Sequence, residues 1–390
     1  MEGIQLQRRE YRTRSGTVMK EKIIEELKKA RSKDLAFSSG RILGSMCTCP
    51  HPIAVKAYRM FIETNLGDPG LFPGTKEIED RVIKMIGSML HAPESMGGRM
   101  TSGGTESNLT ALWISKKMSG KKEVIVSESA HFSFVKASSL MGLKIKVLPS
   151  KNYVADAEML RKAISRDTAC VVGIAGTTNL GLIDPIEEMG EICEKKDVFF
   201  HVDAAFGGFV IPFLQEMGYT KKKFDFEVNG VSSISVDPHK MGMSVIPSGI
   251  LLLRKREWLD VISVESACTH TRKQMSILGT RPGASAAATY AVMKYLGKEG
   301  YMDVVKRCMA ATAYAEKKLT EEGFELVVKP ETNLIGVKVK DAGKIAEKLS
   351  AIGWKVGVDE ENGFIRIVFM PHVKKRLIGE FVKDFKSVVS

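Results

Sequence analysis

The sequence predicts an α/β protein: a large domain with a mainly parallel sheet, followed by a small C-terminal α+β domain. Near-continuous apolar strand patterns alternate with helical patterns, which is typical of parallel sheets covered on both faces. The pattern changes after residue 283. The chain has 390 residues, 44% of them hydrophobic and 27% charged, which is enough apolar material for a large core.

The first 75 residues precede this alternating pattern. Residues 1–18 are polar and basic without apolar periodicity, so we expect a disordered arm. Residues 19–75 form an N-terminal helical segment, with helices from Lys20 and over 53–63. The segment ends in the turn-rich stretch 67–75, whose glycines and prolines predict a stiff loop bordering a pocket. Leu71 and Phe72 in this loop are candidate substrate-pocket residues.

The large domain is expected over residues 76–283. Its predicted strands cover 123–126, 144–148, 169–175, 198–202, 231–236 and 248–253. Its predicted helices cover 76–90, 156–165 and 186–195, and two more begin within 101–108 and 129–133.

The small domain is expected over residues 284–390. A long helical pattern covers 284–322. Strand patterns follow at 326–328, 334–339, 354–358 and 364–369, with helices at 342–352 and from about 374.

Composition excludes several classes of protein. No apolar run reaches the eighteen residues that a membrane span needs. Six irregularly spaced cysteines and no secretory signal predict reduced thiols in the cytoplasm, and no metal site is expected. The net charge of +12 raises the question of nucleic acid, but the lysines are scattered among glutamates on amphipathic helices. We therefore expect no nucleic-acid partner.

Four polar residues follow separate predicted strands of the large domain. They are His131, Thr177, Asp203 and Lys240. Ligands of parallel sheets bind outside the carboxyl ends of the strands, so we expect these side chains to line one site.

The residue types at these strand ends indicate pyridoxal phosphate. A lysine, here Lys240, can bond the cofactor's aldehyde, and Asp203 can hold its ring nitrogen protonated. Gly103, Gly104 and Thr105 open a helix, where backbone amides and the helix dipole favour a phosphate. Further contacts are expected from His239 to the phosphate and from His131 and Ala205 to the two ring faces; Asp237 we interpret as structural.

Several motifs together resemble the group II pyridoxal-phosphate-dependent amino-acid decarboxylases. They are Thr-Ser-Gly-Gly-Thr-Glu-Ser-Asn (101–108), Ser-Ala-His-Phe-Ser (129–133), Gly-Thr-Thr (176–178), His-Val-Asp-Ala-Ala-Phe-Gly-Gly (201–208) and Asp-Pro-His-Lys-Met-Gly (237–242). The archaeal tyrosine/aspartate decarboxylase branch is similar in four further stretches: 44–47, 65–72, 279–283 and 365–372. The resemblance implies fold type I, a homodimer with shared active sites, and loss of the substrate's α-carboxylate as carbon dioxide.

The resemblance also implies residue roles. Lys240 is the lysine that bonds the cofactor, Asp203 is the ring-nitrogen partner, and Thr177 lies near the ring substituents. Arg366 is the candidate for meeting the substrate carboxylate or assisting proton return. Related decarboxylases carry a proton-donating tyrosine on a mobile loop, whereas this sequence has Cys268 at that position; His270 is the alternative proton donor.

The sequence leaves substrate and reaction open. Aspartate would give β-alanine for coenzyme A, and tyrosine would give tyramine for methanofuran. The segments 279–283 and 369–372 favour aspartate, and mixed specificity stays open. A desulfurase or lyase of the same fold, a decarboxylation-dependent deaminase, and a non-catalytic RNA-binding paralogue are the alternatives.

Overall fold

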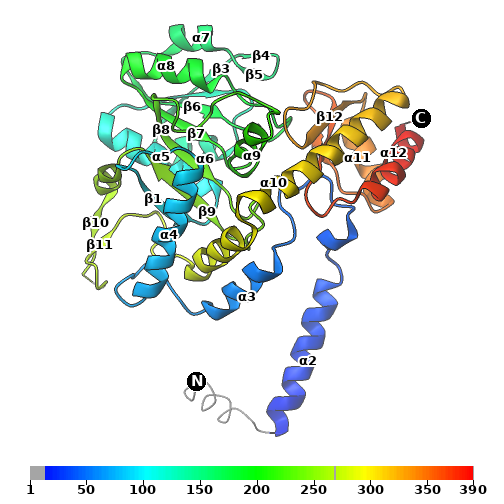
Figure 1. Cartoon of the computed structure of the whole chain (residues 1–390), viewed down its shortest axis with the longest axis horizontal. Helices are drawn as coiled ribbons and strands as arrows, with labels where there is room; N and C mark the ends of the chain where they lie inside the picture. The colour runs from blue at the N-terminus through cyan, green and yellow to red at the C-terminus, as the bar shows by residue number, and fades with distance from the viewer. Residues whose placement is uncertain (1–13, 268, 390) are drawn as a thin grey trace.

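The computed structural model describes residues 14–267 and 269–389 (Figure 1). The large domain is built on a seven-stranded sheet in the order β1-β9-β8-β7-β6-β2-β3. Its strands are β1 (Gly97–Thr101), β2 (Glu123–Ser127), β3 (Lys144–Leu148), β6 (Thr168–Ile174), β7 (Phe199–Asp203), β8 (Val231–Val236) and β9 (Gly249–Leu253). Strand β9 is antiparallel to both of its neighbours, and the pairs from β8 to β3 are parallel. The predicted α/β class with a mainly parallel sheet is confirmed.

Of the large domain's helices that the structure describes, three precede the sheet in the chain and five alternate with its strands. They are α2 (Arg14–Arg31), α3 (Pro52–Met60), α4 (Pro73–Met89), α5 (Gly104–Ser119), α6 (Ser133–Met141), α7 (Ala157–Ala163), α8 (Ile186–Lys196) and α9 (Ile211–Glu216). Short 3-10 turns are η1 (Phe37–Ser39), η2 (Gly207–Phe209) and η3 (Arg256–Ile262). Two small hairpins pair β4 (Ser150–Lys151) with β5 (Val154–Ala155) and β10 (Val264–Glu265) with β11 (Lys273–Gln274).

Alternate side chains of β6 show how the sheet is covered. All seven residues of this strand are buried, as its continuous apolar sequence predicts. Val172 belongs to a cluster with Leu112 of α5, whereas Val171 belongs to the main core with Ile186 of α8. Because neighbouring side chains of a strand point to opposite faces, α5 and α8 cover opposite faces of the sheet.

The small domain is an antiparallel sheet with two helices. Its strands β12 (Leu334–Lys338), β13 (Gly357–Asp359) and β14 (Phe364–Val368) lie in the order β12-β14-β13. The helices are α11 (Ala342–Ala351) and α12 (Lys375–Val389). Trp354 and Phe381 are fully buried between them, with the rings 5.2 Å apart in an edge-on arrangement. A strand predicted at 326–328 is reduced to one bridge, Leu326 with Val337.

The long helix α10 (Gly283–Glu321) joins the two domains and has a break at Gly297, where φ is 59° (Figure 1). Before and just after the break its apolar side chains, such as Val292 and Val305, belong to the large core. Near its end, Leu319 belongs to the small-domain core. The helix therefore contributes to both cores. The domain boundary at residue 283, where the sequence pattern changes, stays a prediction.

The N-terminal region differs from the prediction in where its helix begins. Helix α2 starts at Arg14, so residues 14–18 of the predicted disordered arm are helical, while 1–13 lie outside the described residues. The helix extends away from the rest of the molecule (Figure 1). Of the helices that the structure describes, none has the length and apolarity needed to cross a membrane.

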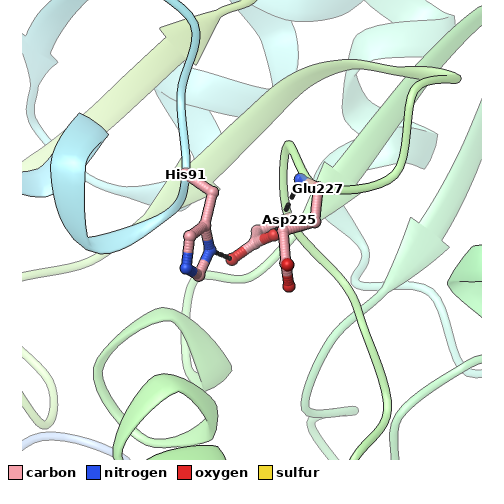
Figure 2. A group of neighbouring side chains, drawn as sticks. All are labelled: His91, Asp225 and Glu227. Atoms are coloured by element: carbon pink, nitrogen blue, oxygen red, sulfur yellow. Dashed lines mark hydrogen bonds and ion pairs between the residues drawn. The ribbon is translucent and has the colours of Figure 1, made fainter.

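A buried carboxylate fixes the turn that follows α4 to the segment before β8. His91 Nδ1 lies 2.8 Å from Asp225 Oδ2, and the backbone N–H of Glu227 donates to Asp225 Oδ1 over 3.0 Å (Figure 2). Within the described residues this is a group of His, Asp and Glu whose ligand atoms all lie within 4.8 Å of one another. Asp225 already accepts two hydrogen bonds, so we interpret the group as structural.

Candidate active site

A cavity of about 350 Å³ lies at the carboxyl ends of β6, β7 and β8, beside the N-terminus of α5. This is the edge of the sheet where the sequence predicts a ligand site. Eight of the predicted site residues line it: Gly103, Gly104, Thr105, His131, Asp203, Ala205, His239 and Lys240. Residues from at least four separate elements therefore meet around one space.

Lys240 ends the turn after β8 and faces a carboxylate of that turn. Its Nζ lies 3.0 Å from Asp237 Oδ2. Burial lowers the pKa of Lys240, but the negative charges of Asp237 and Asp203 outweigh it, so the pKa lies above the ordinary lysine value. The lysine is therefore an ammonium in the absence of a bound group.

Asp203, the last residue of β7, is buried and receives three hydrogen bonds. Asn108 Nδ2 donates to Oδ2 over 2.8 Å, and the Ala205 N–H and the Ser235 hydroxyl donate to Oδ1 over 3.0 and 3.2 Å. Donors on both oxygens fix the direction of this carboxylate in the cavity wall.

Asn108 links Asp203 to a buried histidine. Its Oδ1 lies 2.9 Å from His201 Nε2, and its Nδ2 also donates to the Ser133 hydroxyl. Burial lowers the pKa of His201 to about 4, so the ring is neutral at pH 7. Because a carboxamide oxygen only accepts, Nε2 carries the proton, and Nδ1 then accepts from the Ser233 hydroxyl at 2.8 Å.

The N-terminus of α5 offers backbone amides without a side-chain cap. Gly103, its N-cap, has φ 155° and ψ 178°, which residues other than glycine rarely adopt. A Cβ on Gly103 would lie 3.2 Å from His239 Cε1, and one on Gly104 would lie 3.1 Å from both Ala205 Cβ and Asp237 Oδ2. Any larger residue at these positions would therefore crowd the space before the helix.

The two histidines of the cavity have different hydrogen-bonding roles. His239 Nδ1 lies 2.5 Å from the Ser248 carbonyl oxygen, which can only accept, and its Nε2 lies 3.8 Å from Asp237 Oδ2. His131 Nδ1 accepts from the Ser133 N–H, and burial lowers the pKa of His131 below its usual value. A neutral imidazole suits stacking on an aromatic ring.

Several predicted site residues lie elsewhere. Thr177 is buried with its hydroxyl accepting from the Leu182 N–H, and the next residue, Thr178, lines the cavity instead. Arg366 of β14 donates from Nη1 to the Thr178 carbonyl over 2.8 Å and from Nη2 to the Gly44 carbonyl over 2.5 Å. The guanidinium therefore lies behind the cavity wall rather than in it.

The predicted loop residues form a separate contact. His270 Nδ1 lies 2.9 Å from Asp68 Oδ2, and the His270 N–H donates to Asp68 Oδ1 over 3.2 Å. This pair joins the loop that contains Leu71 and Phe72 to the loop between β10 and β11, and none of these residues lines the cavity. Cys268 lies outside the described residues.

Sequence reasoning missed Asn108 and assigned Asp237 only a structural role. A signal existed for Asn108, because the first two turns of α5 carry polar residues on a side that the adjacent strands must bury. Asp237 lies three residues before Lys240, a spacing that a tight turn brings together. Cavity volume alone does not identify the site. A larger cavity of about 1030 Å³ between α4, α9 and α10 is lined by neither Lys240 nor Asp203.

The residues present fit pyridoxal phosphate. An amine, a fixed carboxylate, an uncapped helix N-terminus and an imidazole face one cavity, as this cofactor's aldehyde, ring nitrogen, phosphate and ring require. Asp237 Oδ1 is buried and has no hydrogen-bond partner among the described residues. An unsatisfied buried oxygen at this position is consistent with a polar group completing the site.

Comparisons with known proteins agree with this geometry. Residues 60–340 match the model of the pyridoxal-dependent decarboxylase conserved domain. The chain is 47% identical over 359 residues to a probable L-tyrosine/L-aspartate decarboxylase of Methanothermobacter thermautotrophicus, covering 91% of this chain and 99% of the relative. It is 45% identical to an L-aspartate/L-glutamate decarboxylase of Pyrococcus horikoshii (95% and 98% covered) and 43% identical to a probable L-aspartate decarboxylase of Archaeoglobus fulgidus (94% and 99%).

Solved structures show the same fold. A sphingosine-1-phosphate lyase of Burkholderia pseudomallei superposes with a TM-score of 0.87 at 26% identity, covering 95% of this chain and 90% of that one. A glutamate decarboxylase of Lactobacillus brevis gives a TM-score of 0.84 at 22% identity, covering 94% and 91%. The expected fold type I is therefore confirmed.

Proposed function

Because this chain belongs to the family of pyridoxal-dependent decarboxylases, we propose that it decarboxylates L-aspartate and, with mixed specificity, L-tyrosine. The observation that carries the proposal is the meeting of Lys240 and Asp203 with the N-terminus of α5 in one cavity. L-Aspartate is the substrate that the names of the three relatives share. The products would be β-alanine for coenzyme A and tyramine for methanofuran, formed in the cytoplasm.

Each residue has a defined task in this proposal. Pyridoxal phosphate, when bound, supplies the electron sink that accepts the pair left by the departing carboxylate. Lys240 would provide the amine that bonds the cofactor, and Asp203 would accept a hydrogen bond from the protonated ring nitrogen. The amides of Gly104 and Thr105 would hold the phosphate, and His131 would cover the ring.

His270 is our candidate for returning a proton to the substrate carbon. Asp68 accepts from Nδ1 and holds the ring in one orientation, which leaves Nε2 for proton transfer. The hydrogen bond to His270 is also the main cause that lowers the pKa of Asp68 below its usual value. Since this pair does not line its own chain's cavity, the proposal assigns it to the cavity of a second subunit.

A homodimer is supported by the apolar surface of α2. Met19, Ile23 and Leu27 follow one another at four-residue spacing and are 60, 47 and 60% exposed. Large apolar side chains on one face of a helix that extends away from the molecule indicate an interface with another chain. Size-exclusion chromatography with light scattering tests this: Ile23→Asp/Leu27→Asp should shift the chain toward monomer, and a monomeric parent protein would contradict the proposal.

The reaction is tested by incubating holoenzyme with each of the twenty amino acids. Carbon dioxide and the corresponding amine should appear with aspartate, tyrosine or both. No carbon dioxide from any amino acid would contradict the proposal, and sulfide from cysteine would favour the desulfurase alternative. Aldehyde with ammonia would indicate the deaminase, and salt-dependent RNA binding without cofactor absorbance would favour the RNA-binding paralogue.

Variants separate the roles of the residues. Lys240→Ala should lose the absorbance of covalently bound cofactor, whereas Lys151→Ala, on an exposed hairpin, is the matched control and should keep it. Cys268→Tyr should raise the ratio of amine to aldehyde product. An unchanged ratio would mean that another residue already returns the proton.

A further inference from the structure

We propose that Asp237 is a positioning residue that holds the ε-ammonium group of Lys240 whenever this amine is not bonded to another group. The inference rests on the proposed function and deepens it. It assigns to the site a carboxylate that sets the fraction of Lys240 present as the neutral, nucleophilic amine. A purely structural aspartate would instead be fully satisfied by its own turn.

The turn that follows β8 places the two side chains together. The backbone N–H of Lys240 donates to the Asp237 carbonyl over 3.0 Å, which closes a four-residue turn. The Asp237 N–H donates to the Ala205 carbonyl over 3.2 Å and ties the turn to the end of β7. The side chains then meet in the cavity with Nζ and Oδ2 3.0 Å apart.

Burial makes this contact strong. Asp237 is 2% exposed, and the Lys240 side chain is 20% exposed. Water therefore screens the pair much less than a surface ion pair. Among the described residues, Asp237 is the one carboxylate within ion-pair distance of Lys240 Nζ.

Asp203, the other carboxylate of the cavity, is already committed to other donors. Asn108, Ser235 and Ala205 donate to its two oxygens. Asp237, by contrast, has a second oxygen without a partner in the described part of the chain. Asp203 is therefore fixed in the cavity wall, whereas Asp237 can pair with the Lys240 ammonium whenever that group is released.

The proton balance explains why such a residue is useful. When a substrate amine takes the place of Lys240, the substrate's ammonium gives up one proton, and the released lysine amine would take up one proton and become an ammonium. Without a counter-charge, a buried ammonium is costly and tends to lose its proton, and the neutral amine would compete with the substrate. Asp237 retains the charged form three residues away in the same turn.

The test measures the titration of Lys240 directly in the cofactor-free full-length protein. Competitive acetylation with mass spectrometry reads the reactivity of the Lys240 peptide against pH, and exposed lysines such as Lys151 and Lys221 are internal standards. In the parent protein Lys240 should titrate above these standards. Titration below them would overturn the proposal even if no variant folded.

Two isosteric variants complete the test. Asp237→Asn should lower the midpoint for Lys240 by about one to three pH units, so that acetylation near neutral pH rises about tenfold or more. Asp203→Asn, the matched control in the same cavity, should lower it less. An unchanged midpoint in Asp237→Asn, or an equal or larger shift in Asp203→Asn, would overturn the assignment.

Because this titration needs no cofactor, its outcome is independent of the proposed decarboxylation. Borohydride reduction of the parent holoenzyme, followed by mass analysis, should place the cofactor on Lys240. If no cofactor is found there, the proposed function fails. If it is found while Asp237→Asn titrates like the parent protein, only the role of Asp237 fails.

Discussion

Replacing Asn108 with aspartate should make the protein's stability strongly dependent on pH. The parent carboxamide donates to Asp203 Oδ2 over 2.8 Å and accepts from His201. Asn108→Asp puts a second buried carboxyl group at this distance from the first. Two carboxylates so close repel each other, so the pair retains one proton to a pH well above the ordinary carboxyl pKa.

The magnitude follows from the shift expected for such a pair. Burial and like-charge contact raise one carboxyl pKa by about two to three units in the folded state, and each unit corresponds to about 1.36 kcal/mol. A raised folded pKa contributes stability below the unfolded pKa and loses it as pH rises. Relative to the parent protein, Asn108→Asp should therefore lose about 3–4 kcal/mol between about pH 4 and 8.

Denaturant unfolding at several pH values measures this loss. The double variant Asn108→Asp/Asp203→Asn is the control, because it exchanges the amide and the carboxylate and leaves one charge with donors on both sides. It should recover most of the pH-dependent loss. A constant difference between Asn108→Asp and the parent protein across this pH range, or no recovery in the double variant, would refute the reasoning.

Three further variants test other buried polar groups by the same unfolding measurement. Glu79→Gln leaves the 4% exposed Arg281 side chain without its charge partner at 2.6 Å and should cost about 3–5 kcal/mol, whereas Glu79→Gln/Arg281→Met should cost less. Burial raises the pKa of Asp184 from 3.8 to about 6. The free energy of unfolding should therefore fall by about 3 kcal/mol as pH rises from about 4 to above 6. Asp184→Asn should abolish that part of the pH dependence. Arg366→Met leaves two carbonyls without donors and should cost about 2–4 kcal/mol, and a loss below about 1 kcal/mol would mean that water replaces the guanidinium.

The sequence predicts the parallel strands well because each one is a short run in which apolar residues recur, most continuously in β6. Strand β1 has no such run: its sequence Gly-Gly-Arg-Met-Thr pairs with β9 because glycine fits where a Cβ on Gly98 would lie 2.8 Å from Ile83 and Leu252 atoms. Such a close approach depends on tertiary packing, which no local pattern records. The sharing of α10 between two cores is hidden for the same reason, since it appears in the sequence as one helix pattern.

The residues of the site likewise divide into those that the sequence pattern predicts and those that depend on tertiary packing. Strand-end residues such as Asp203 and Lys240 could be predicted because sheet topology brings the carboxyl ends of parallel strands together. The contact between Asn108 and His201 could not, because it depends on how far α5 approaches β7 across the sheet face.

The residues that lie away from the cavity share one property. Arg366, His270 and Phe72 all belong to segments outside the seven-stranded sheet. The sheet positions the groups that would hold the cofactor, and these groups are common to many reactions of that cofactor. We therefore expect the choice of substrate to depend on segments that the sheet does not position. Arg366 already contacts the cavity wall through the carbonyl of Thr178, so a small movement of the C-terminal domain would change the shape of the cavity.

His270, held by Asp68 on the loop surface, can contribute only where another chain presents its cavity to that loop. The proposed proton donor therefore requires the proposed dimer: a chain that is monomeric yet fully active would exclude His270 as the donor.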